Sequence, residues 1–145
     1  MLKTAALTVS IATAAALLAT PALSQTGGRK LQTSLSGAVE VPGPGDTDGR
    51  GAATVTVNPG KNQICYTLSV RNIDRATGAH IHEAAPGAAG PVVVPLKAPS
   101  TGSANGCVTV ARELAMEILK TPSDYYVNVH NAAFPAGAVR GQLAK

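Results

Sequence analysis

A repeated alternation of apolar and polar residues, interrupted by glycine and proline, constrains the fold of this chain more than any other feature. In 31–41 the apolar residues fall mainly at odd positions, and 53–57 and 64–70 repeat the period of two. Because successive side chains of a strand point to opposite faces, this pattern predicts half-buried β-strands. Further short strands are predicted at 78–83, 92–96, 106–110, 124–130 and 137–143.

Turns and one helix complete the expected fold. The segments PGPGDTDGRG (42–51) and NPGKN (58–62) have the composition of turns. In 111–120 (ARELAMEILK) the apolar residues are at helical spacing and Pro122 follows, which predicts a short amphipathic helix packed on the strands. About eight short strands with one helix favour an all-β fold, a Greek-key β-sandwich.

The N-terminus has the three parts of a secretory signal. Lys3 precedes an uncharged, largely apolar stretch, and Ala22 and Ser24 supply small residues just before Gln25. An uncleaved membrane anchor is the alternative, but hydroxyl residues and Pro21 interrupt a run that would need about 20 mostly apolar residues to span a bilayer. Cleavage and export are therefore favoured.

This interpretation divides the chain into three parts. We expect residues 1–24 to be a signal peptide, 25–30 a flexible lead-in and 31–145 one folded domain, in the periplasm or secreted. No stable membrane insertion is expected after cleavage.

Charge and motifs exclude several functions. The 12 Lys and Arg residues are scattered, and the chain has no Trp and one Phe, so nucleic acid is not an expected partner. No nucleophile motif or phosphate-binding loop is present, so no catalytic residue is assigned. The sequence identifies no protein partner.

Two cysteines, Cys65 and Cys107, occupy polar-face positions of two predicted strands. In an exported protein such thiols are more often paired than free. A bridge would close a loop of about 42 residues and could contribute roughly 4 kcal/mol on the chain-entropy model. We expect a disulfide on the outer face of two neighbouring strands; two free thiols are the alternative.

All three histidines lie in predicted strands, His80 and His82 in GAHIHEA and His130 in YYVNVHN. Residues two apart on a strand share a face, so the H-x-H pair presents two imidazoles side by side. Imidazole suits copper and zinc, and three convergent histidines can form a trigonal or open four-coordinate site. A metal site with copper as its possible cofactor is one interpretation. Histidines on the surface or hydrogen-bonded to loop carbonyls are the other.

Three further polar residues share these outer faces. Tyr126 and Asn128 lie on the same face of their strand as His130, and Arg140 points outward from the last strand. Tyr126 or Asn128 could orient an imidazole from outside the coordination sphere, and Arg140 could favour the approach of an anion.

Five segments carry a resemblance to a known family. They are SLSGAVEVP (34–42), GAATVTV (51–57), ICYTLSV (64–70), GAHIHEAAPGAAGPVVVPL (78–96) and YYVNVHNAAFPAGAVRGQL (125–143). From about Leu31 to Leu143 the chain resembles a CHRD domain, the module named from chordin. The resemblance implies a β-sandwich module of secreted proteins and implies little about chemistry.

A weaker resemblance concerns the histidines, which are similar in pattern to those of copper–zinc superoxide dismutase. It implies copper ligands at His80, His82 and His130 and an anion-guiding role for Arg140. No further histidine remains for a bridging ligand, and no His/Asp-rich loop is present for zinc. The favoured function is therefore metal binding by an exported CHRD-domain protein. A metal-free interaction or structural module is the alternative and a dismutase-like enzyme a minor one, so enzymatic activity is left open.

Overall fold

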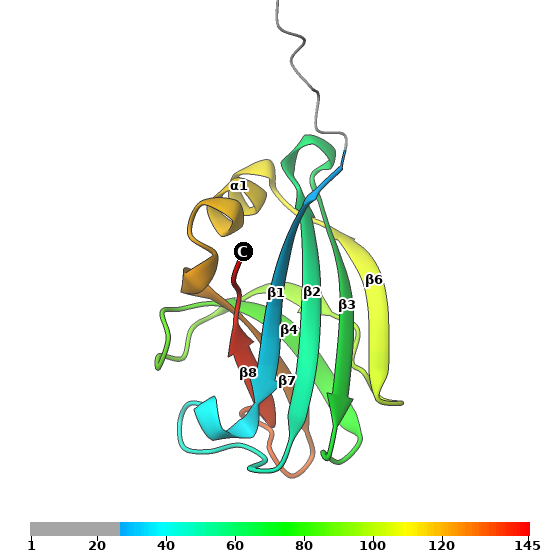
Figure 1. Ribbon diagram of the computed structural model, residues 1–145, viewed down its shortest axis with the longest axis vertical. Helices are drawn as coiled ribbons and strands as arrows, with labels where there is room; N and C mark the ends of the chain where they lie inside the picture. The colour runs from blue at the N-terminus through cyan, green and yellow to red at the C-terminus, as the bar shows by residue number, and fades with distance from the viewer. Residues whose placement is uncertain (1–26) are drawn as a thin grey trace, which may run out of the picture.

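The computed structural model describes residues 27–145, so the predicted signal peptide and the start of the lead-in lie outside the described residues. The described part contains eight strands and one α-helix (Figure 1). The strands are β1 (Arg29–Ser36), β2 (Arg50–Asn58), β3 (Gln63–Arg71), β4 (Ala76–Glu83), β5 (Val92–Leu96), β6 (Ser103–Thr109), β7 (Tyr125–Asn131) and β8 (Val139–Gln142). The helix is α1 (Arg112–Lys120), and the single-turn 3-10 helices are η1 (Gly37–Val39), η2 (Pro59–Lys61) and η3 (Pro122–Asp124). No helix in residues 27–145 has the length and hydropathy needed to cross a bilayer.

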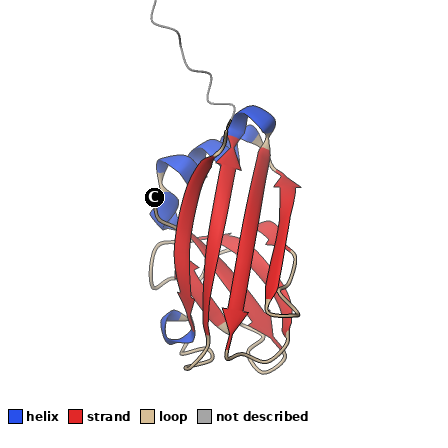
Figure 2. Ribbon diagram, turned by 45° about the vertical axis from the view of Figure 1, so that its right-hand side comes forward, coloured by secondary structure: helices blue, strands red, loops and turns tan. Residues whose placement is uncertain are grey.

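The strands form two packed layers. They are ordered β5-β4-β7-β8-β1-β2-β3-β6, and every pairing of named strands is antiparallel. Between β8 and β1 the register holds only the Ser36–Arg140 pair, so the sheet folds over at this seam. Figures 1 and 2 show β1, β2, β3 and β6 as one layer that crosses the other strands at an angle.

Three connections carry the chain from one layer to the other, β3 to β4, β5 to β6 and β6 to β7. Neighbours in the sheet are therefore often distant in sequence, as expected for a sandwich with crossing connections. The prediction of an all-β fold with about eight short strands and one helix is confirmed.

The core lies between the layers and consists of the inward positions of the alternating strands. Val55, Ile64, Ile81, Val127 and Val129 are each fully buried in it. Burying a side chain of this size contributes roughly 1.5–3 kcal/mol. The outward positions of β4, β7 and β8 are left to carry polar side chains.

Helix α1 closes one end of the sandwich (Figure 1). It buries Ala115 and Ile118 in the core and ends at Lys120, two residues before Pro122. The helix predicted for 111–120 is thus confirmed, with a start one residue later.

The first strand is shorter at its C-terminal end than predicted. β1 ends at Ser36, whose hydroxyl accepts a hydrogen bond from Ala38 N at 3.3 Å and caps η1. Gly37 packs directly on the backbone of Asp46, where any side chain would collide. The turn that follows carries Glu40 into the protein, where only 7% of it is exposed.

The predicted disulfide is confirmed. Cys65 on β3 and Cys107 on β6 face each other directly in the strand register and are bonded. Ile64 and Tyr66, on either side of Cys65, are buried and Cys107 is exposed, so the bridge lies on the outer face and ties β6 to the rest of its layer. Such a bond is compatible with an oxidising compartment outside the cytoplasm.

Candidate metal centre

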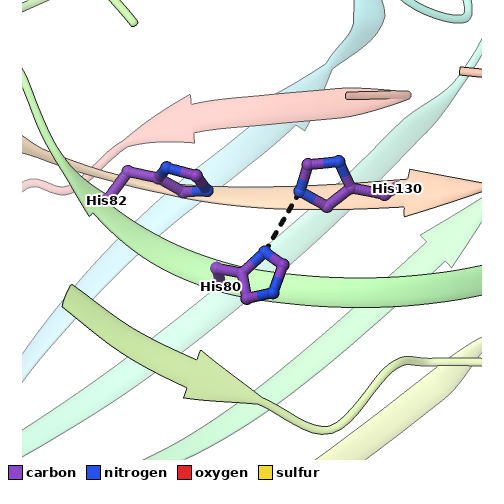
Figure 3. A group of neighbouring side chains, drawn as sticks. All are labelled: His80, His82 and His130. Atoms are coloured by element: carbon purple, nitrogen blue, oxygen red, sulfur yellow. Dashed lines mark hydrogen bonds between the residues drawn. The ribbon is translucent and has the colours of Figure 1, made fainter. Parts of the chain in front are cut away.

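Strands β4 and β7 bring the three histidines to one outer face. On β4, Ala79 and Ile81 are fully buried, so the alternation points His80 and His82 outward. Strand β7 pairs antiparallel with β4 and sets His130 opposite Gly78. Figure 3 shows the three rings converging from these two strands.

The ring nitrogens are close to a spacing that a metal ion requires. His80 Nδ1 lies 3.1 Å from His130 Nε2, and one nitrogen from each of the three rings lies within 4.8 Å of the others. Ligands at about 2.0–2.1 Å from one metal ion are about 3–4 Å from each other. His80 and His130 already satisfy this spacing, and a movement of His82 by about an ångström would complete it.

Backbone carbonyls determine which nitrogen of two rings carries the proton. His82 Nδ1 lies 2.9 Å from Gly90 O, and His130 Nδ1 lies 3.0 Å from Pro135 O. A carbonyl oxygen only accepts, so each Nδ1 donates and each neutral ring keeps its lone pair on Nε2. His80 Nδ1 must then donate to His130 Nε2, because that nitrogen is an acceptor.

These hydrogen bonds reconcile the two interpretations of the histidines. The carbonyls occupy Nδ1 of His82 and of His130, so Nε2 is the ligand atom of both rings; that of His82 makes no hydrogen bond within residues 27–145, and that of His130 accepts one from His80. A hydrogen bond from the second ring nitrogen is the usual way in which proteins orient a metal-ligating histidine. Gly90 O and Pro135 O thus orient these two rings, and sequence reasoning missed them because a backbone carbonyl has no residue signature.

A buried ring nitrogen of His82 has no hydrogen-bond partner among the described residues. His82 Nε2 is buried in the described structure and makes no hydrogen bond. Leaving a buried acceptor unsatisfied costs about 1–3 kcal/mol. A metal ion at the convergence of the three rings would use this lone pair, so the orphaned atom fits the donor set.

The histidines are held in the neutral form. Burial is the main cause that lowers the pKa of each of His80, His82 and His130 below the usual value of 6.5. The neighbouring imidazoles lower the pKa of His80 further, and the charge of Arg140 lowers that of His82. Neutral imidazole is the form that binds metal, so no imidazolium has to lose its charge at neutral pH.

Tyr126 and Arg140 form a stack beside His82. The rings of His82 and Tyr126 are nearly parallel, at 8°, with centroids 4.8 Å apart. The guanidinium carbon of Arg140 lies 3.5 Å from the Tyr126 centroid. Because β4 and β8 flank β7 on opposite sides, His82 and Arg140 approach Tyr126 from opposite sides.

The segment 84–91 covers this stack. Arg140 Nη1 donates to Ala88 O at 3.0 Å, and Gly90 N donates to the Tyr126 hydroxyl at 3.2 Å. Gln142 Nε2 donates to Ala84 O at 2.6 Å. Arg140 is consequently only 2% exposed, so it shares the outer face with the histidines but lies beneath a loop.

Asn128 lies opposite His80 in the register and is buried. Its Nδ2 donates to Glu40 Oε1 at 2.8 Å, so its amide is directed to Glu40. Burial raises the pKa of Glu40 to about 7, although Arg140 and hydrogen bonds from Val41 and Asn128 lower it. Sequence reasoning missed Glu40 because it occupies a polar position of the predicted strand 31–41, which indicates a solvent-facing side chain.

Comparison with known proteins supports one assignment. Searches of curated proteins and of solved structures found no significant match. The model of the CHRD domain family matches residues 31–143, which include every strand from β2 to β8 and all three histidines. The chain therefore belongs to the CHRD domain family.

Proposed function

We propose that this protein is an exported CHRD-domain protein that binds one metal ion, with copper favoured, through His80, His82 and His130. The observation that carries the proposal is the arrangement of lone pairs. Two rings are anchored through Nδ1 by carbonyls, and the remaining nitrogens face each other across a partly buried space.

The donor set favours copper. It consists of three neutral imidazoles, since the two cysteines are joined in a disulfide elsewhere on the sandwich. Imidazole binds copper and zinc well, and divalent copper binds such a site more tightly than zinc in the general order of affinities. Nδ1 of His80 completes the set once its proton moves to Nε2 of the same ring, which leaves the ring neutral.

Three protein ligands leave a coordination position free. A bound metal would be reachable there by water, a small anion or the ligand of another protein. Such a centre is suited to storing or transferring the ion, and it also permits exchange of an electron.

A metal-free structural module is the second candidate, and one observation favours it. The histidines form hydrogen bonds without any ion: His80 donates to His130, and His82 and His130 donate to backbone carbonyls. In this case the histidines join β4, β7 and the loop that contains Pro135.

Titration of the purified mature chain with Cu(I) and with Cu(II) separates the two. Metal binding predicts about one ion per chain and loss of most of the affinity in His80→Ala, His82→Ala and His130→Ala. Lys145→Ala is the control, because this exposed terminal residue is remote from the histidines in sequence and lies beyond β8. Equal affinity in the parent chain and in the histidine variants would contradict the metal site and favour the structural module.

A further inference from the structure

A buried positive charge whose hydrogen-bond acceptors are uncharged lies next to the candidate centre. Arg140 is 2% exposed, and its hydrogen-bond acceptors among the described residues, Ala88 O and Gln142 Oε1, are both uncharged. Its guanidinium also rests on the Tyr126 ring. The carboxyl of Glu40, whose charge acts on Arg140, has a pKa of about 7 and is hydrogen-bonded to Asn128, so it only partly offsets the arginine at neutral pH.

Only one aromatic ring separates this charge from a candidate ligand. Tyr126 is stacked on His82, and Arg140 lies on Tyr126. The segment 84–91 covers the stack, and Tyr126 and Arg140 are buried beneath it, so solvent screens the charge little. A positive charge on the ring of His82, or on an ion bound to it, is therefore repelled by Arg140.

We infer that the centre selects monovalent copper, Cu(I), over the divalent ions Cu(II) and Zn(II). This inference rests on the proposed function. Three neutral imidazoles leave the charge of the ion uncompensated, and the described residues place no carboxylate within the histidine cluster. The complex then carries one positive charge with Cu(I) and two with a divalent ion, and Arg140 repels the second complex more strongly.

The size of the selection follows from Coulomb's law. For charges on the order of 9 Å apart in an environment of effective dielectric constant about 20, one additional unit charge changes affinity on the order of tenfold. The same electrostatic preference changes the reduction potential of the bound copper. In this couple, bound Cu(II) takes up one electron from an external donor and becomes Cu(I). Each tenfold preference for Cu(I) raises the potential of this one-electron couple by about 59 mV.

The test measures affinity and potential on the mature protein. Cu(I) affinity is determined anaerobically by competition with a chromophoric Cu(I) chelator, and Cu(II) and Zn(II) affinities are determined by calorimetry. A redox titration with mediators gives the potential of the copper-loaded protein. We expect Cu(I) to bind more tightly than either divalent ion, and the potential to lie above that of aqueous copper.

Variants then test whether Arg140 is responsible. Arg140→Gln should reduce the preference for Cu(I) on the order of tenfold and lower the potential by about 59 mV, whereas Arg140→Lys should retain most of both. Arg71→Gln removes an exposed arginine from β3 in the other layer and should change neither. Retention of the parent potential in a folded Arg140→Gln protein would overturn the role of the arginine.

The parent protein decides the outcome if Arg140→Gln does not fold. Binding of Cu(II) or Zn(II) as tightly as Cu(I) would overturn the selectivity while leaving the metal site intact. Absence of any histidine-dependent binding would instead contradict the proposed function itself.

Discussion

Replacing Glu40 by glutamine should remove a pH-dependent loss of stability. Glu40 is buried, accepts a hydrogen bond from Asn128, and has its pKa raised by burial from 4.5 to about 7. The folded protein therefore holds this proton more tightly than the unfolded chain does. Because the folded pKa is the higher one, this group makes the free energy of unfolding fall as pH rises from about 4.5 to about 7, with little change above that range.

The magnitude follows from the two pKa values. At about 1.36 kcal/mol per pKa unit the complete effect is about 3.4 kcal/mol, of which about 2.5 kcal/mol develops between pH 5 and pH 8. The histidines act in the opposite direction, because their lowered pKa values cost stability as pH falls below about 6.5. The parent protein alone would show the sum, so the difference between variant and parent is the informative quantity.

Urea unfolding of both proteins at pH 5 and pH 8 measures this difference. Glutamine retains the acceptor for Asn128 and cannot ionise, so the variant should gain about 2.5 kcal/mol relative to the parent between the two pH values. Glu113→Gln replaces an exposed glutamate on α1 and should show no such gain. A Glu40→Gln difference that is the same at pH 5 and pH 8 would refute the assignment of a buried carboxyl with a raised pKa.

Three further predictions concern the disulfide, the centre and the N-terminus. Replacing Cys65 and Cys107 by serine should lower the free energy of unfolding by up to about 4 kcal/mol in urea unfolding; two alkylatable thiols in the exported parent protein would contradict the bridge. Metal affinity should decrease as pH falls below the lowered pKa values of the three histidines, since protons compete for their lone pairs, and titrations at pH 7.5 and pH 5 will measure it. Mass analysis of exported protein should find the N-terminus at or near Gln25, and a full-length chain retained in the cytoplasm would exclude the signal peptide.

The strands, and the face of the strand on which each side chain lies, could be predicted because they are local properties. The period of two in GAHIHEA buries Ala79 and Ile81 and turns His80 and His82 outward regardless of which strand lies beside them. The same reasoning placed both cysteines on outer faces. Strand ends were less accurate, because the end of β1 depends on Gly37 packing against Asp46 from a later turn.

The composition of the candidate site was predictable only in part. Its three histidines are the only ones in the chain and all lie on outward strand positions. Their convergence depends on the pairing of β4 with β7, strands separated in sequence by β5, β6 and α1. No spacing in the sequence encodes that pairing.

The sequence by itself therefore determined the all-β class, the face on which each histidine and cysteine lies, and the family. The tertiary structure alone decided what those outward side chains meet. It set Gly90 O and Pro135 O against two ring nitrogens, and it covered Arg140 with the segment 84–91. The physical reason is that alternation along a strand is a property of a few adjacent residues. The burial of a side chain, the ring nitrogen that carries its proton and the electric field at the site depend instead on backbone atoms and charges that distant segments contribute.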